Sequence, residues 1–211
     1  MKLVVFGATG GTGGTKVVEQ ALSAGHDVVP AARRPEAVPP RDRLVIVQCD
    51  VLEAPAVAAA ISGGDAVIAT IGPASNRKPG TLISAGVRNL LAGCVAGGVN
   101  RFVFESGILV GDGRELSRSG RLALKMAGFV NSALKADKVL AEASITASPL
   151  DWVIVRPPIL KHTPATGDCV AAPRARISPA KAISHADCAA ALVTAATESQ
   201  WVGQVVNVGR R

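Results

Sequence analysis

The sequence predicts an α/β protein in which helices cover both faces of a doubly wound parallel sheet within a single domain. Three observations carry this prediction. A short apolar strand at residues 2–6 runs directly into a glycine-rich turn and then into a helix. Strand-like and helix-like segments alternate along the rest of the 211 residues. Most of the strand segments are apolar throughout, as expected for strands buried between two layers of helices.

Hydrophobic periodicity and turn residues place the elements in order. We expect strands at residues 2–6, 27–32, 43–49, 65–71, 101–105, 150–155 and 204–208. We expect helices ending before Gly25, at 53–62, from 82 to Gly97, across 121–147 with a break near Gly128, and at 185–197. Residues 108–120 and 159–182 are expected to be irregular. Pro30 is an awkward strand member because proline cannot donate a ladder hydrogen bond. We find no boundary or repeat that would divide residues 1–211, so one Rossmann-like domain is expected.

The composition, 48% hydrophobic and 18% charged, is typical of a globular protein. No apolar run approaches the ~18 residues that a membrane span needs, so no membrane association is expected. The first strand begins at Lys2, which leaves no room for a signal peptide. The sequence therefore predicts a cytoplasmic protein, either a monomer or a small homo-oligomer.

The four cysteines are scattered and the three histidines form no close pair, so no metal site is expected. The net charge of +7 could suggest a nucleic-acid partner. There is no dense run of Lys and Arg and no known binding motif, which makes that partner unlikely. An anionic cofactor and an anionic substrate explain the positive charge equally well.

The glycine-rich turn after the first strand predicts a dinucleotide site. Gly7 lets the chain leave the strand sharply, Gly10 lets a pyrophosphate approach the backbone, and Gly13 lets the helix pack close to the sheet. The N-terminus of the following helix offers free N–H groups to phosphates, and Thr9 and Thr12 can add hydroxyl donors. The alternative is a βα turn that binds nothing. The position between a buried strand and a helix favours the dinucleotide site.

The end of the second strand predicts which dinucleotide is bound. A site that prefers NAD usually has Asp or Glu about 20 residues beyond the glycine turn, where the acid holds the ribose 2′-hydroxyl. Here Arg33 and Arg34 occupy that place. A guanidinium can clamp a 2′-phosphate, which favours NADP(H). The alternative is a pair of solvated surface arginines.

Three further residues are candidates for the site: Asp50 and Ser106 end strands, where ligands bind in this fold, and Lys138 lies on the long helix. Asp50 could bond the adenine amino group or simply cap a helix. Ser106 could donate to a substrate carbonyl or be an ordinary turn serine. Lys138 could reach the nicotinamide ribose or be a solvated helix lysine. With these, the expected cofactor-binding residues are Gly7, Thr9, Gly10, Gly11, Thr12, Gly13, Arg33, Arg34, Asp50, Val51, Thr70, Ile71, Gly72, Ser106, Lys138, Pro157 and Pro158, and the expected catalytic residues are Ser106 and Lys138.

At these residues the sequence resembles the atypical short-chain dehydrogenase/reductase superfamily. The matching segments are residues 5–13, 64–68, 86–90, 138–140, 151–158 and 183–187, and they run nearly from end to end of the chain. Their order is similar to that of the NAD(P)H-binding branch that includes biliverdin-IXβ reductase/flavin reductase and the NmrA-like proteins. The resemblance implies a Rossmann fold, NADP(H), and often the reduction of flavins or quinone-like compounds.

The chain departs from the wider superfamily at one position. Its usual enzymes pair a tyrosine, which gives a proton to the substrate, with a lysine four residues later. With Lys138 as the lysine, the tyrosine position holds Leu134, and the chain contains no tyrosine. Leucine cannot transfer a proton, so alcohol dehydrogenation by that pair is excluded.

Two functions remain. The first is hydride transfer from NADPH to a flavin or a similar planar acceptor, such as a biliverdin- or quinone-like compound. The second is a regulatory protein of the NmrA-like type that senses NADP(H) without turning it over. In the first case, we expect residues 73–80, 108–120 and 159–182 to build the acceptor pocket.

Overall fold

The structure is a computed structural model that describes residues 1–9, 13–73, 80–114, 116 and 118–211. Its main sheet is built from β1 (Lys2–Phe6), β2 (Asp27–Ala32), β3 (Val47–Gln48), β4 (Ala66–Ala69), β5 (Arg101–Glu105), β6 (Asp151–Arg156), β8 (Val170–Pro173) and β10 (Gln204–Gly209). The strand order is β3-β2-β1-β4-β5-β6-β10-β8. Neighbouring strands are parallel except that β8 runs antiparallel to β10. This arrangement confirms the doubly wound α/β fold.

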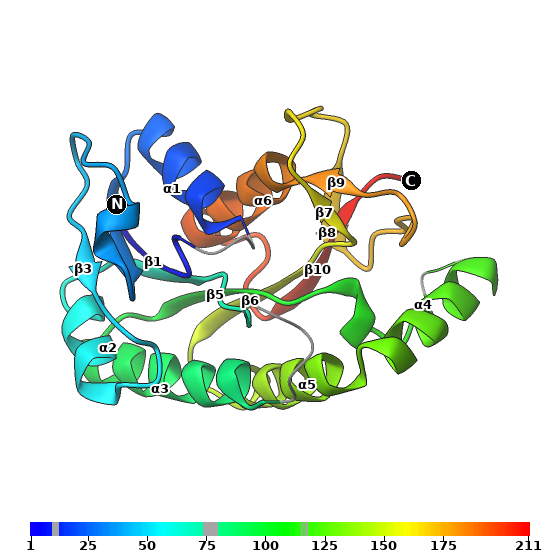
Figure 1. The fold of residues 1–211 in the computed structure, drawn as a ribbon, viewed down its shortest axis with the longest axis horizontal. Coiled ribbons are helices and arrows are strands. Elements are labelled where there is room, and N and C mark those ends of the chain that lie inside the picture. Colours follow the sequence, from blue (N-terminus) through cyan, green and yellow to red (C-terminus); the bar gives the residue numbers. More distant parts are fainter. Residues whose placement is uncertain (10–12, 74–79, 115, 117) are drawn as a thin grey trace.

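Helices lie on both faces of this sheet (Figure 1). They are α1 (Gly14–Ser23), α2 (Ala54–Ile61), α3 (Leu82–Gly97), α4 (Arg118–Val130), α5 (Ser132–Thr146) and α6 (His185–Thr197), with short 3-10 helices η1 (Pro35–Ala37) and η2 (Ile108–Val110). A small parallel pair, β7 (Leu160–Lys161) with β9 (Ile183–Ser184), leads into α6. Among the described residues, none of the helices combines the length and hydropathy needed to cross a membrane.

Two apolar layers hold the helices onto the sheet, and β5 shows how one strand serves both. Phe102 and Phe104 pack with residues of α2, α3 and α5, whereas Val103 packs with residues of α1 and α6. All three side chains are fully buried. Side chains alternate between the two faces of a strand, so a strand covered on both sides is apolar at every position. This explains the uninterrupted apolar runs in the sequence.

The third strand is shorter than the sequence predicts. We expected a strand at residues 43–49, but only Val47–Gln48 pairs as a strand, after a single bridge between Leu44 and Val28. On β2, the N–H of Val28 bonds the Arg43 oxygen, so the backbone nitrogen of Pro30 lies on the same edge. Proline has no hydrogen to donate there, and the ladder is interrupted beside it. Arg43 also has a left-handed backbone, with φ of 59°.

Two other segments differ from expectation. The helix expected across 121–147 is divided at Asn131 rather than near Gly128, and its first half begins within the segment 108–120 that we expected to be irregular. The segment 159–182 contains β7 and the edge strand β8. β8 has only four residues, Val-Ala-Ala-Pro, and this composition carries little strand signal.

Candidate cofactor site and the adjoining polar cluster

The glycine turn after β1 brings three backbone segments into close contact. Gly7 has φ of +86°, and a Cβ atom on it would lie 2.6 Å from the carbonyl oxygen of Thr70 at the end of β4. A Cβ on Gly14, the first residue of α1, would lie 2.2 Å from the oxygen of Gly7. Only glycine fits at either position, because any side chain would push the backbones apart. The turn thus lies where the strand order reverses between β1 and β4, the position at which such folds bind ligands.

The role expected for Gly13 belongs to its neighbour. We expected Gly13 to allow close packing of the helix against the sheet, but Gly14 makes that approach. Gly13 instead has φ of +99°, and its Cβ would lie 2.9 Å from Nδ1 of His185, the first residue of α6. Gly13 therefore allows α1 to begin close to α6. The other expected turn residues, Gly10, Gly11 and Thr12, lie outside the described residues.

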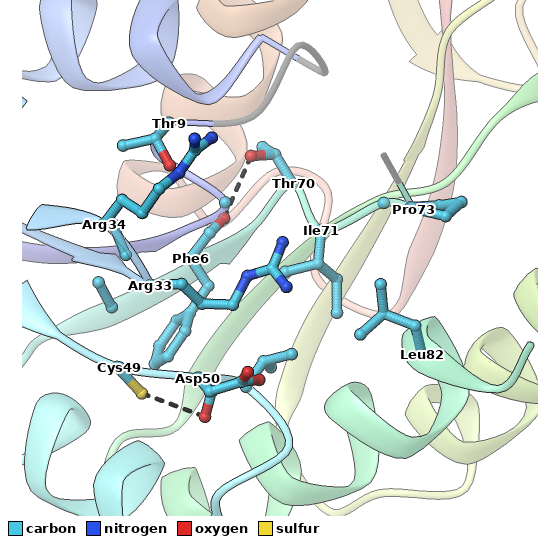
Figure 2. Close-up of a pocket in the computed structure, with 15 residues that line it drawn as sticks. Phe6, Thr9, Arg33, Arg34, Cys49, Asp50, Thr70, Ile71, Pro73 and Leu82 are labelled. Atoms are coloured by element: carbon cyan, nitrogen blue, oxygen red, sulfur yellow. Dashed lines mark hydrogen bonds between the residues drawn. The ribbon is translucent and has the colours of Figure 1, made fainter. Parts of the chain in front are cut away.

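A cavity of about 480 Å³ opens beside this turn, at the carboxyl ends of β1, β2 and β4 (Figure 2). Its walls come from the ends of these strands and from the start of α3, so that residues as far apart in sequence as Phe6 and Leu82 lie around it. Of the residues expected to bind the cofactor, it gathers Gly7, Thr9, Arg33, Arg34, Asp50, Val51, Thr70, Ile71 and Gly72. Pro73 also lines it, from the segment expected to reach the acceptor.

The two arginines after β2 border this cavity with exposed side chains, as Figure 2 shows. Neither forms an ion pair with any of the described residues. Asp50 lines the same cavity, and its Oδ1 accepts a hydrogen bond from the Leu52 N–H at 3.0 Å. Asp50 therefore holds the turn that precedes α2, while Glu53 is the residue at the N-cap of that helix.

The start of α1 is suited to an anion. Among the residues that the structure describes, no side chain caps this N-terminus, and the first turn of the helix contains no acidic residue. Thr15 instead donates its hydroxyl hydrogen to the oxygen of Ala8 at 3.0 Å, which ties the helix back to the turn. The uncapped end combines unpaired N–H groups with the positive end of the helix dipole, and together they favour phosphate groups.

Ser106 and Lys138 meet at the end of β5. The ammonium of Lys138, on α5, donates a hydrogen bond to the backbone oxygen of Ser106. A Cβ on Gly107 would lie 3.5 Å from the same ammonium nitrogen. The hydroxyl of Ser106 is buried without a hydrogen-bond partner among the described residues. The two expected catalytic residues are thus together, but neither lines the cavity beside the glycine turn.

A buried carboxyl group, which the sequence analysis missed, lies beside this lysine. Glu105 is the last residue of β5 and is 7% exposed. Burial raises the pKa of Glu105 to about 7, although the nearby Lys138 lowers it in part. Burial likewise lowers the pKa of Lys138, and the nearby carboxyl groups of Glu105 and Glu142 oppose this shift. In the sequence, Glu105 ends a strand that is otherwise apolar after its first residue, and no pattern there sets it apart from the strand.

Glu142 is the second acid that acts on Lys138, and it is already paired. Both of its carboxylate oxygens accept hydrogen bonds from the guanidinium of Arg156, the last residue of β6. Glu105 has no ion pair of this kind with any described residue. Glu105 is therefore the buried carboxyl group near Lys138 whose charge no arginine neutralises.

Asp137 connects this cluster to the cavity wall. Its carboxylate accepts hydrogen bonds at 2.9 Å from the backbone N–H groups of Ile83 and Ser84, in the first turn of α3. The residue before them, Leu82, lines the cavity. Asp137 thus caps α3 from a neighbouring helix and fixes the position of Lys138, which follows it on α5.

The other expected strand-end residues, Pro157 and Pro158, are buried and line neither of the two larger cavities. The oxygen of Pro157 accepts a hydrogen bond from the Ile108 N–H at 2.9 Å. This bond joins the end of β6 to η2, close to Ser106.

A second cavity, of about 1200 Å³, lies between the start of α4 and the segment around β8. Two of the segments expected to build an acceptor pocket, 108–120 and 159–182, therefore come together. The cavity has an apolar lining that includes Leu116 and Ile177, and cations from Arg114, Arg176 and Arg211. Leu116 and Ile177 also pack with Ile108, which follows Ser106 by two residues.

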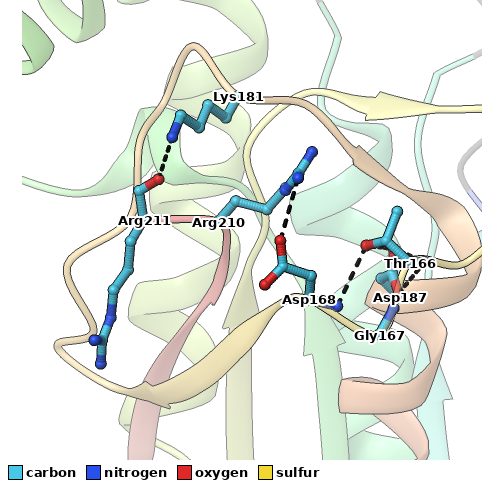
Figure 3. Close-up of polar contacts among 7 residues, drawn as sticks. All are labelled: Thr166, Gly167, Asp168, Lys181, Asp187, Arg210 and Arg211. Atoms are coloured by element: carbon cyan, nitrogen blue, oxygen red, sulfur yellow. Dashed lines mark hydrogen bonds and ion pairs between the residues drawn. The ribbon is translucent and has the colours of Figure 1, made fainter.

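The segment that leads to β8 is fixed to α6 by one carboxylate (Figure 3). Asp187 accepts hydrogen bonds from the hydroxyl of Ser184, from the N–H of Thr166 and from the N–H of Gly167. Beyond it, Asp168 pairs with Arg210, and Lys181 donates to the backbone oxygen of Arg211, as Figure 3 shows. The ring of His162, in the same segment, lies 4.4 Å from the ring of His185.

Within the described part of the chain, no group of three or more His, Cys, Asp or Glu side chains is arranged to hold a metal ion.

Solved structures share this fold over nearly their whole length. An anaerobilin reductase (ChuY) of Escherichia coli O157:H7 has a TM-score of 0.78 at 24% identity, covering 100% of this chain and 97% of that one. A short-chain dehydrogenase/reductase of Veillonella parvula, solved in complex with NADP, also has a TM-score of 0.78, at 14% identity, covering 99% and 94%.

Sequence comparison gives a nearer relative. A chloroplastic protein of Arabidopsis thaliana, named as uncharacterized, is 36% identical over 183 residues, or 82% of this chain. The chain spans 64% of the length of that relative. The model of the family described as NAD(P)H-binding matches residues 7–199. This chain therefore belongs to the NAD(P)H-binding family of Rossmann-fold proteins, which confirms the resemblance found in its sequence.

Proposed function

We propose that this protein is an NADP(H)-dependent reductase that transfers a hydride from NADPH to a flavin or a similar planar acceptor. One observation carries the proposal: the cavity beside the glycine turn is bordered by Arg33 and Arg34 at the end of β2. An acid at that strand end would repel a 2′-phosphate, whereas two unpaired guanidinium groups attract one.

The residues present fit such a cofactor. The glycine turn that leads into the start of α1 would hold the pyrophosphate, and Asp50, which lines the same cavity, would bond the adenine. NADPH supplies the hydride when bound. The chain supplies the geometry, and holding the reacting atoms at about 3–3.5 Å gives much of the acceleration.

The second cavity supports an acceptor with a flat apolar body and an anionic group. Its apolar lining suits ring systems, and its arginines suit a phosphate or carboxylate. Among proteins of similar fold, the Escherichia coli relative is named as an anaerobilin reductase, which supports reductase chemistry on such compounds.

The test compares two cofactors and follows turnover. Purified protein is titrated with NADPH and with NADH, and the oxidation of each is followed at the nicotinamide absorbance band with FMN as acceptor. We expect tighter binding of NADPH and its oxidation only when FMN is present. Equal affinity for the two cofactors would overturn the NADP(H) preference, and binding of NADPH without reduction of any planar acceptor would overturn the reductase.

A second candidate is an NADP(H)-sensing regulatory protein. One observation favours it: the chain has no tyrosine, and Leu134 packs against the core at the position where a proton-donating tyrosine would stand. Firm NADPH binding with no turnover, together with a change in partner binding between NADPH and NADP+, would establish this candidate instead.

A further inference from the structure

The side of α4 that packs against the protein is poorer in apolar atoms than the side that faces solvent. Gly120, Leu124 and Gly128 are buried at a spacing of four residues, so the inward side of this helix is mostly glycine. Leu124 alone packs into an apolar cluster. In Figure 1, α4 extends away from the sheet beyond the end of α5. A surface helix normally turns its larger apolar residues toward the core, and α4 does the reverse.

Three large apolar side chains make up the outward side, which we call the apolar face of α4. Leu122 is 62% exposed, Met126 66% and Phe129 83%. They are four and three residues apart, which places them next to one another on the helix surface. The other three of the four phenylalanines in the chain are almost fully buried. Neighbouring apolar side chains that are exposed in this way mark a surface that another molecule covers.

Two cations border the apolar face. Arg121 and Lys125 are exposed, and neither forms an ion pair with any of the described residues. Lys125 is three residues from Leu122 and four from Phe129, so it adjoins both of them on the helix surface. The sequence of α4 contains no Asp or Glu. The molecule that covers this face therefore combines an apolar part with negative charge.

A second copy of this chain fits the face poorly. Two copies that joined their apolar faces would bring the cations of both helices together, and like charges repel. The net charge of +7 on each chain adds to this repulsion. A stable interface also buries about 800 Å² on each partner, which is more than three side chains provide.

We propose that α4 binds the surface of a membrane that contains anionic lipids. Its apolar face enters the boundary between the lipid headgroups and the acyl chains, while Arg121 and Lys125 contact the lipid phosphates. Arginine and lysine can do this because their apolar stems lie along an apolar surface while their charged ends reach outward. This inference is independent of the proposed reductase function.

A helix that lies on a membrane does not have to cross it. We expected no membrane association because no apolar run is long enough to span a bilayer. The 13 residues of α4 are too few to span one, but a helix at the membrane surface is distinguished by its two unlike sides and not by its length. With three apolar side chains and two cations, we expect binding that is reversible and that weakens as the salt concentration rises.

The first test measures sedimentation of the whole protein with lipid vesicles. We expect binding to vesicles of phosphatidylcholine mixed with phosphatidylglycerol at low salt, and little binding to phosphatidylcholine alone. Leu122→Ser combined with Phe129→Ser should lower the partition coefficient about 20-fold, because both side chains lose apolar area that the lipid buries. The matched control combines Val45→Ser with Val95→Ser, at two exposed valines outside α4, and should bind like the wild type.

Two further variants test the cations and the depth of the helix separately. Arg121→Gln combined with Lys125→Gln should lower the affinity for the anionic vesicles about 10-fold. Phe129→Trp should give tryptophan fluorescence that brominated lipids quench more strongly than they quench the native tryptophans of the wild type. All the replaced side chains are exposed, so circular dichroism and thermal unfolding of these variants should match the wild type.

Three results would overturn the inference. The first is a wild type that does not sediment with anionic vesicles at low salt. The second is a double serine variant of Leu122 and Phe129 that sediments as well as the wild type, since the net charge of the chain would then explain the binding. The third is a wild-type dimer in analytical ultracentrifugation that this double variant abolishes, without binding to vesicles, which would assign the apolar face to a second copy.

Discussion

The carboxylate of Asp137 holds the backbone N–H of Ser84 at 2.9 Å, so that a side chain of α5 caps the start of α3. Both residues are buried. The contact fixes one wall of the cavity beside the glycine turn relative to Lys138, because Leu82, which lines that cavity, precedes the two capped residues. Neither Asp137 nor Ser84 lines the cavity itself.

We predict that Asp137→Ala destabilises the protein by about 1–3 kcal/mol, because it leaves the N–H groups of Ile83 and Ser84 buried without an acceptor. Urea unfolding measures the loss. Asp151→Ala, at an exposed carboxylate at the start of β6, is the control and should change stability little. Equal effects of the two substitutions would show that the cap contributes nothing.

Gly14→Ala should damage the glycine turn after β1. Its Cβ would lie 2.2 Å from a backbone oxygen of Gly7, so the turn and α1 must separate. We expect a loss of about 1–3 kcal/mol in stability and a marked loss of NADPH affinity. Gly97→Ala, where the nearest atom would be 3.7 Å away, should be neutral in both measurements. Calorimetric titration with NADPH tests this, and unchanged affinity of the Gly14→Ala protein would contradict it.

Replacing both Arg33 and Arg34 with alanine should weaken NADPH binding by about 2–4 kcal/mol through the loss of charge-assisted hydrogen bonds. NADH, which lacks the 2′-phosphate, should bind nearly as before. Fluorescence titration with the two cofactors measures the difference. Equal losses for both would show that these arginines do not recognise the phosphate.

Glu105 should also make stability depend on pH. Its pKa is about 7 in the folded protein and about 4.5 in the unfolded chain, so the folded state binds the extra proton between these values. Stability should therefore fall as pH rises from 5 to 7, by up to ~3 kcal/mol. The difference between wild type and Glu105→Gln in urea unfolding isolates this contribution. A constant difference from pH 5 to 8 would contradict it.

Arg176→Ala should distinguish two acceptors that share one ring system. Arg176 lines the second cavity and is exposed, without an ion pair among the described residues. We expect the KM for FMN to rise about 10-fold through loss of a phosphate contact, and the KM for riboflavin to change little. Arg88→Ala, at an exposed arginine on α3, is the control.

The sequence was most informative where backbone geometry dictates residue type. Gly7 and the apolar strands are readable because a tight turn and a doubly covered sheet leave few alternatives. The arginines after β2 were found for a related reason, since strand ends in this fold lie on one rim. These positions were enough to predict the fold and most of the residues that line the cavity beside the glycine turn.

The polar residues near the end of β5 were harder to predict, because their interactions join segments that are distant in the sequence. Glu105 looks like an ordinary strand end until Lys138 is placed beside it, 33 residues later. Asp137 looks like a solvated helix residue until α3 lies against it. Pro30 is unusual for a strand residue, and this is visible in the sequence. That it interrupts β3 is visible only in the structure, where the N–H of Val28 on β2 points toward the β3 side.

Both edge strands of the sheet are short. At one edge, β3 has only two residues and so offers few free backbone groups. At the other, β8 ends at Pro173, which has no N–H, and the next residue, Arg174, turns the chain away with φ of 55°. Exposed strand edges invite pairing between molecules, and both devices discourage it. The short and proline-ended edge strands therefore discourage edge-to-edge pairing of this sheet with a second copy of the protein.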